Sequence, residues 1–166
     1  MKTILVGPDI ELTPDIVHEV ANNRNARVEL SPAAKRAVKK SRAVVEKMVE
    51  SNAVVYGVTT GFGNFKNKHI HHDEVAALQR NLIRSHAAGV GSIFSPEIVR
   101  GILLVRLNSL AQGYSGVRLE LLDLLCGIIN KGIIPSIPSQ GSVGSSGDLA
   151  PLSHACLVLM GEGEAE

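Results

Sequence analysis

The sequence has few aromatic residues, and this scarcity bears on its fold. Aromatic residues make up 3% of the 166 residues and Trp is absent, whereas hydrophobic residues make up 45%. Aromatic side chains are enriched in strands, so a core of Leu, Ile, Val and Ala suits packed helices better than a sandwich or a barrel. The length is sufficient for one packed domain with its own core. We therefore expect a mainly helical domain.

Strong charge, a cysteine framework and long apolar runs are also missing. The net charge is +1, which gives no electrostatic basis for binding nucleic acid or an anionic membrane. Cys126 and Cys156 both have apolar neighbours, which favours buried free thiols in a reducing cytosol over a disulfide or a metal site. The apolar patch near the N-terminus is followed at once by Asp9 and Glu11, so it is too short for a secretory signal or a membrane span. We expect a cytoplasmic protein with no membrane partner.

Ser or Thr followed by Pro marks three expected helix starts, at Thr13–Pro14, Ser31–Pro32 and Ser95–Pro96. Pro tolerates the first position of a helix, and Ser or Thr can cap it. Helices are expected at 14–22, from 32 onward, and at 73–88, 96–111, 119–130 and 148–160, with a few short strands near the N-terminus at 3–6 and 28–30. Pro135 and Pro138 predict an extended connector before the last helix.

Apolar side chains surround most of the predicted helix at 96–111, including Ile98, Ile102 and Val105. A helix that is apolar on nearly every side is expected to be buried on several sides. A chain of this length offers few partners for such helices. We therefore expect it to be part of a longer protein.

The segment Gly141–Ser142–Val143–Gly144–Ser145–Ser146–Gly147–Asp148 can form an electrophile from its own backbone. The amide nitrogen of Gly147 can attack the carbonyl carbon of Ser145 and close a five-membered ring. Loss of water from that ring and from the Ser146 side chain leaves a methylene group conjugated to an imidazolone. Gly147 has no side chain to obstruct this approach, and Asp148 can cap the next helix and assist the proton transfers. An isolated Gly-Ser-Ser-Gly is more often a loop that caps a helix or binds an anion.

With its flanks, the run from Gly141 to His154 closely resembles the signature of the ammonia-lyases that make a methylidene-imidazolone (MIO) group. These are the histidine ammonia-lyases and their phenylalanine, tyrosine and aminomutase relatives. The resemblance implies the N-terminal part of the aspartase/fumarase-like helical lyase fold, with residues 1–166 as one region. It also implies an MIO group formed from Ser145, Ser146 and Gly147 with the help of Asp148, and no metal. Most members have Ala where this chain has Ser145, a mild change because only the carbonyl carbon enters the ring.

The stretch Tyr56–Gly57–Val58–Thr59–Thr60–Gly61–Phe62–Gly63 resembles the mobile inner loop of the same family. On its own, a Tyr before a Gly-rich loop is usually a packing residue. The resemblance implies that Tyr56 is the general base that takes a proton from the substrate β-carbon and that Gly63 belongs to the substrate-binding loop. A phenol is a weak base at neutral pH, so this role requires nearby positive charge or hydrogen bonds.

Two further polar residues match positions that line or brace the site in the family. The resemblance implies that His86 selects the substrate side chain, since it can pair with an imidazole or a phenol but not with a phenyl ring. A lone His on an apolar helical stripe is otherwise a satisfied core residue. Asn108 is expected to bind substrate, or else to be a buried hydrogen-bond partner. The cluster His69–Ile70–His71–His72 has no acidic or thiolate partner, so an exposed loop is expected there and not a zinc site.

The resemblance implies non-oxidative deamination of an aromatic amino acid, with L-histidine going to urocanate and ammonia as the first choice. A tyrosine ammonia-lyase or a tyrosine 2,3-aminomutase is the alternative. The second alternative is a non-catalytic fragment or an assembly partner, because active sites of the family take residues from three subunits of a homotetramer. The arginine that binds the substrate carboxylate lies in a part of the family that this chain does not include. We therefore expect the chain alone to be inactive on its small-molecule substrate.

Overall fold

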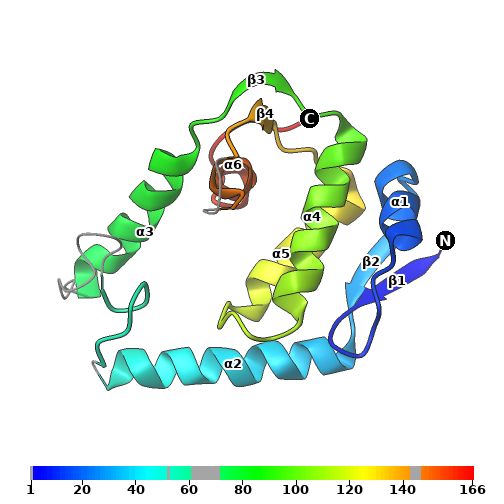
Figure 1. Ribbon diagram of the computed structural model, residues 1–166. Helices are drawn as coiled ribbons and strands as arrows, with labels where there is room; N and C mark the ends of the chain where they lie inside the picture. Colours follow the sequence, from blue (N-terminus) through cyan, green and yellow to red (C-terminus); the bar gives the residue numbers. More distant parts are fainter. Residues whose placement is uncertain (1, 52, 61–71, 143–146) are drawn as a thin grey trace.

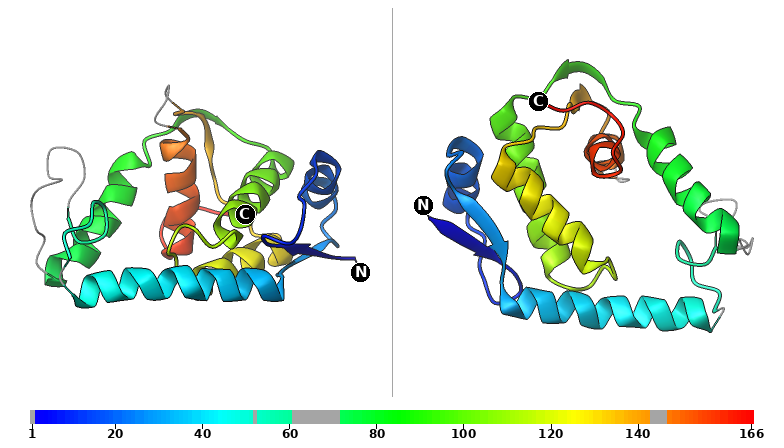
Figure 2. Two further views of the ribbon diagram at one scale, coloured as in Figure 1. Left: turned by 60° about the horizontal axis from the view of Figure 1, so that its bottom comes forward. Right: turned by 180° about the vertical axis from the view of Figure 1, so that it is seen from behind.

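The computed structural model describes residues 2–51, 53–60, 72–142 and 147–166. Within these ranges the order of elements is β1 (Thr3–Val6), α1 (Pro14–Asn22), β2 (Arg27–Leu30), α2 (Pro32–Glu50), α3 (His72–His86), β3 (Val90–Ile93), α4 (Pro96–Ala111), α5 (Leu119–Lys131), β4 (Pro138–Gln140) and α6 (Leu149–Leu159). Helices α2, α3 and α4 form the three sides of a frame, with β3 joining α3 to α4 (Figure 1). Helix α6 stands inside this frame, between α3 and α4 (Figure 2).

The predicted helix starts are confirmed, although the three caps differ in their hydrogen bonds. Thr13 Oγ1 accepts a hydrogen bond from Ile16 N at 3.4 Å. Ser31 Oγ accepts from Ala34 N at 3.1 Å and donates to Asp9 Oδ1 at 2.7 Å. Ser95 makes no side-chain cap bond to the backbone of α4. Pro in the first turn is therefore the feature that the three starts share.

The main core lies between the N-terminal sheet and helices α1, α4 and α5. Strands β1 and β2 pair in parallel, with alternate residues buried and exposed. The buried strand residues are Ile4, Val6, Val28 and Leu30. Helix α4 contributes the largest buried face, at Val99, Leu103, Leu104, Leu107 and Leu110. Burial of this aliphatic surface provides the main driving force for folding.

Arg100 lies within this core and is 1% exposed. Its guanidinium donates to Val20 O at 2.9 and 3.0 Å and to Ile129 O at 2.8 Å. Carbonyls near the C-terminal end of a helix lack partners within the helix, so Arg100 satisfies such groups in both α1 and α5. The hydrophobic pattern of α4 gave no indication of this role.

Asn130 joins α5 to the sheet. Its Oδ1 accepts a hydrogen bond from Val28 N at 2.7 Å, and its Nδ2 donates to Val28 O at 2.9 Å. The amide side chain thus pairs with the free edge of β2 as a neighbouring strand would.

Strands β3 and β4 bring the residues that follow α3 next to those that precede Gly141. They pair antiparallel, with Val90 opposite Gln140 and Ile93 opposite Pro138. The extended connector predicted from Pro135 and Pro138 is confirmed at β4, but β3 was not predicted. All four residues of β3 are exposed, so the strand has no buried face. A strand without a buried face lacks the alternation of apolar and polar residues by which strands are recognised in a sequence.

Burial of α4 is less complete than its sequence predicts. Ile98 is 49% exposed and Val105 is 52% exposed, so the expectation of burial on several sides was wrong at these positions.

None of the helices in the described ranges is long and apolar enough to cross a membrane.

Candidate active site

The proposed ring-forming segment leads into α6. Asp148 occupies the N-cap position, but its side chain makes no cap hydrogen bond, so the predicted cap was wrong. Instead, its carboxylate accepts a short hydrogen bond from Ser142 Oγ. This bond joins the two ends of the segment. The carboxylate therefore forms a hydrogen bond within the segment and not with the backbone of α6.

Gly147 has a left-handed backbone conformation, with φ of +76°. Among the described residues, no group beyond the chain neighbours of Gly147 lies within 4 Å of the position that a Cβ would occupy there. The backbone conformation, and not crowding, is thus what favours glycine in this structure. Ser145 and Ser146, the other two residues of the predicted ring, lie outside the described residues.

A cleft of about 500 Å³ lies beside the start of α6. Its apolar wall comes from Phe94, Gly101, Ile102, Val105, Pro151 and Leu152, and its polar groups come from Arg106, Ser109, Ser139, Ser142 and Asp148. An apolar wall with a few polar groups is typical of small-molecule sites. Of the candidate residues that the structure describes, Asp148 alone lines this cleft.

His86 lies in the last turn of α3 and is partly buried. Its Nδ1 is 2.8 Å from Leu82 O and 3.1 Å from Ser85 Oγ. Since a carbonyl oxygen can only accept, Nδ1 carries the hydrogen of the neutral ring and Nε2 is the acceptor. Leu78 and Leu82 are also partly buried, as expected for the stripe that they share with His86.

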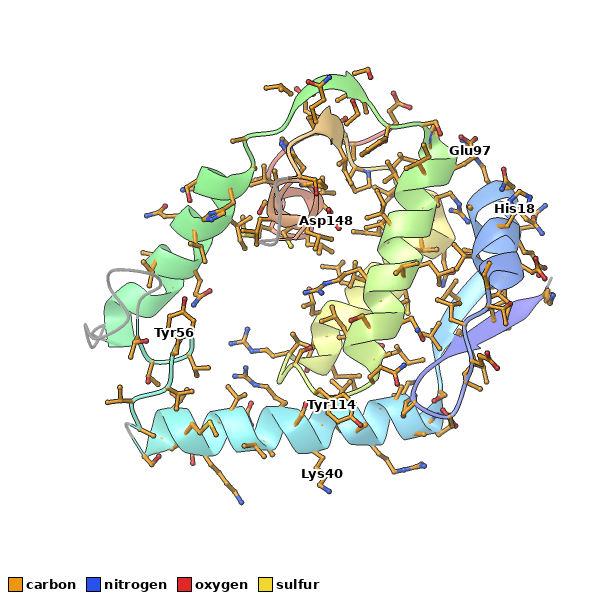
Figure 3. The ribbon with its side chains drawn as sticks, viewed as in Figure 1. His18, Lys40, Tyr56, Glu97, Tyr114 and Asp148 are labelled. Atoms are coloured by element: carbon orange, nitrogen blue, oxygen red, sulfur yellow. The ribbon has the colours of Figure 1, made fainter. Side chains whose placement is uncertain are left out.

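Tyr56 lies in the turn between α2 and α3 and is 61% exposed. The turn closes around Thr59, whose Oγ1 accepts from Val55 N at 2.9 Å and donates to Ala53 O at 2.5 Å. Figure 3 shows Tyr56 near α3, whereas Asp148 lies at the start of α6 on the side that faces α4. The candidate base and the candidate ring segment therefore come from separate parts of the frame. Gly63 lies outside the described residues.

Asn108 presents an unusual polar atom. Its Oδ1 is buried and has no hydrogen-bond partner among the described residues. Most buried polar atoms in proteins are paired, so this oxygen is suited to a donor from a ligand or from another segment. The neighbouring Arg106 lines the cleft, whereas Asn108 does not.

The structure shows no metal centre in the part of the chain that it describes, because no three His, Cys, Asp or Glu side chains gather there. The stretch 69–71 of the histidine cluster lies outside the described residues. The two predicted free thiols are confirmed, with Cys126 buried and Cys156 partly buried. Burial raises the pKa of Cys126 to about 11 and also raises the pKa of Cys156. Both thiols are thus poor nucleophiles at neutral pH.

Several interactions attach α3 and the residues after it to α6 and to the residues that follow α6, including an ion pair from Arg80 to Glu162 at 4.0 Å. Gly89 N donates to His154 Nε2 at 3.0 Å. Arg84 forms a bidentate ion pair with Glu162, at 2.8 and 2.7 Å. The sequence prediction assigned no role to His154. The available signal was a single imidazole in the otherwise apolar α6, since a buried polar group needs a partner.

The sequence matches the family described as "Aromatic amino acid lyase" over residues 12–166, and the chain therefore belongs to this family. Histidine ammonia-lyase from Alkaliphilus oremlandii is 52% identical to it over 165 residues, which are 99% of this chain and 32% of that protein. Among solved structures, histidine ammonia-lyase from Trypanosoma cruzi has a TM-score of 0.89 at 38% identity, covering 99% of this chain and 30% of that one. Tyrosine aminomutase from Streptomyces globisporus has a TM-score of 0.87 at 42% identity, covering 98% of this chain and 30% of that one.

These comparisons confirm the family and the mainly helical fold predicted from the sequence. The chain spans about a third of the length of the curated relatives that it matches.

Proposed function

We propose that the protein to which this chain belongs removes ammonia non-oxidatively from an aromatic amino acid and converts L-histidine to urocanate. Family membership and the 52% identity to a histidine ammonia-lyase support the reaction class. The preference for histidine over phenylalanine rests on one observation, the hydrogen bond that makes Nε2 of His86 an acceptor. The preference for histidine over tyrosine is supported by the similarity to histidine ammonia-lyases.

Nε2 of His86 would accept a hydrogen bond from the imidazole N–H of bound histidine. Phenylalanine offers no donor at this position, so it would leave this acceptor unpaired. A site built to hydrogen-bond its substrate rejects such an analogue strongly. His86 is therefore the proposed substrate-selecting residue.

Ser145, Ser146 and Gly147 are the proposed source of the MIO group, with Asp148 assisting its formation. The described surroundings fit this group, because Gly147 is left-handed, no side chain of the described residues crowds it, and Ser142 binds Asp148 across the segment. When present, the group supplies a strong electrophile that no ordinary side chain provides. The N-terminus of α6 contributes positive potential at this place.

Tyr56 is the proposed general base, and its role is to hold the proton taken from the substrate β-carbon. Its exposed position in the turn leaves it accessible to a substrate. Asn108 Oδ1 is the proposed acceptor for a substrate donor, which its unpaired state supports. Gly63 is proposed to belong to the loop that covers the substrate.

Tyrosine is the second candidate substrate, with either ammonia loss or 2,3-amino migration as the outcome. Its phenol O–H would also donate to His86 Nε2. The similarity to a tyrosine aminomutase at 42% identity supports this alternative.

We also propose that residues 1–166 form one N-terminal region of a lyase that works as a homotetramer in the cytoplasm, and that the chain alone has negligible turnover. The share of its relatives that it spans, about a third, supports the expectation of inactivity.

The test is to join this chain to the remaining two thirds of the Alkaliphilus oremlandii enzyme and to offer the hybrid protein histidine, tyrosine or phenylalanine. We expect urocanate from histidine, and loss of the discrimination against phenylalanine when His86→Leu is introduced. Coumarate or β-tyrosine as the main product would support the tyrosine alternative. A folded hybrid protein that makes no product would support the non-catalytic alternative.

A further inference from the structure

Three segments meet in a tightly packed junction formed by Gly89, Gly141, Ala150 and His154, called the glycine junction below. A methyl group in place of the Gly141 hydrogen would lie 2.9 Å from Ala150 Cβ and 3.2 Å from Gly89 Cα. A methyl group at Gly89 would lie 3.1 Å from His154 Nε2. The end of α3, the start of the 141–148 segment and the first half of α6 thus approach each other as closely as glycine allows.

The glycine junction lies between two parts of the proposed site. His86 precedes Gly89 by three residues, and Gly141 begins the segment that carries Ser145, Ser146 and Gly147. Helix α3 packs against α6, and its ion pair from Arg84 to Glu162 is exposed to solvent. A solvent-exposed ion pair fixes geometry only weakly. The bond from Gly89 to His154 is partly buried and is therefore less exposed to competition from water.

We propose that His154 is a positioning residue, which accepts the Gly89 N–H and thereby sets the position of His86 relative to Gly141 and the start of α6. This inference rests on the proposed function, because only a shared substrate makes the relative position of these two parts matter. The bond requires Nε2 of His154 to be unprotonated, so the hydrogen of the neutral ring is on Nδ1. Loss of the acceptor would leave the Gly89 N–H without this partner and release the last turn of α3.

The test uses nuclear magnetic resonance of the chain with three substitutions. His154→Leu removes the acceptor and keeps an apolar side chain in α6. His154→Gln offers an amide oxygen at a reach similar to that of Nε2. His18→Gln is the matched control, since His18 is an exposed histidine of α1 that bonds to Asn22 of the same helix. The readouts are the exchange rate of the Gly89 amide hydrogen and the ring resonances of His86.

We expect about tenfold faster exchange of the Gly89 amide in His154→Leu, together with shifted His86 resonances, because a net hydrogen bond is worth about this factor. His154→Gln should restore both readouts, and His18→Gln should change neither. Unchanged Gly89 exchange in a folded His154→Leu variant would overturn the inference, as would failure of Gln to restore it.

A measurement on the unsubstituted chain keeps the inference testable if His154→Leu does not fold. The nitrogen shifts of the His154 ring should identify Nε2 as the unprotonated nitrogen, and a hydrogen on Nε2 would contradict the inference. None of these readouts depends on turnover. If the substrate assignment is wrong, the product assay will therefore show it, whereas the Gly89 exchange rate and the histidine resonances will be unaffected.

Discussion

Arg84 of α3 and Glu162, which follows α6, are joined by two hydrogen bonds of 2.8 and 2.7 Å. The hydrogen bond from Arg84 lowers the pKa of Glu162, and the same contact raises the pKa of Arg84. The pair connects the helix that carries His86 to the residues that follow α6.

Removing this pair by Glu162→Gln should lower the melting temperature only slightly, because exposed ion pairs contribute little. The difference from the unsubstituted chain should shrink as salt is added, since salt screens exposed charges. Glu46→Gln is the control, because it removes a pair with Arg42 inside α2 and joins no two elements. Amide exchange in the last turn of α3 should rise in Glu162→Gln only. A large, salt-independent loss of stability would contradict this account.

The pH dependence of stability should show the contribution of His154. Burial lowers the pKa of His154 below its ordinary value of 6.5, so the native state favours the neutral ring. Below pH 6.5 the unfolded chain binds this proton more readily than the native state, so stability falls as the pH falls. The contribution of Glu162, whose ordinary pKa is 4.5, is present above that pH and is lost at lower pH.

Thermal melts between pH 7 and pH 5 therefore separate the two groups. The melting temperature of the unsubstituted chain should fall over this interval, and the fall should be smaller in His154→Gln. An equal fall in both proteins would show that another group titrates there.

Arg100→Met should destabilise the fold by about 2–4 kcal/mol, because carbonyls of α1 and α5 lose their buried donor. Arg36→Met on the exposed face of α2 is the control and should change stability by less than about 0.5 kcal/mol. Urea denaturation of the two variants measures the difference. Equal stability of the two variants would mean that water satisfies the carbonyls as well as Arg100 does.

Gly147→Ala and Gly132→Ala form a matched pair, since both glycines are left-handed and a new Cβ at either would have no group of the described residues within 4 Å beyond its chain neighbours. Each substitution should cost about 1 kcal/mol of stability through backbone strain. Only Gly147→Ala should prevent formation of the ring, because a side chain at position 147 would obstruct the approach of its amide nitrogen to the carbonyl carbon of Ser145. Ring formation that is equally impaired in Gly132→Ala would point to global destabilisation as the cause.

Local signals in the sequence predicted much of this fold. Pro after Ser or Thr located three helix starts, and alternating burial follows the predicted strands at β1 and β2. The features that sequence reasoning missed depend on distant residues. Strand β3 forms only because β4 pairs with it, and Arg100 is buried only because two helix ends meet around it.

The candidate site shows the same division. A motif identified Asp148, but its bond to Ser142 replaced the predicted cap. His154 was part of the same motif, and yet its partner Gly89 lies 65 residues away in the sequence. The partner of His154 could not be inferred from spacing, because the pairing of β3 with β4 places Gly89 next to the segment that leads into α6.

Intact-mass spectrometry of the purified chain, followed by peptide mapping, tests the central claim most directly. We predict a deficit of two water molecules, located in the peptide that contains Ser145, Ser146 and Gly147. The Ser145→Ala variant should show the same deficit, and Gly147→Ala should have its full mass. A full, unmodified mass in both the unsubstituted chain and the Ser145→Ala variant would contradict the claim that this segment forms the MIO group in this chain.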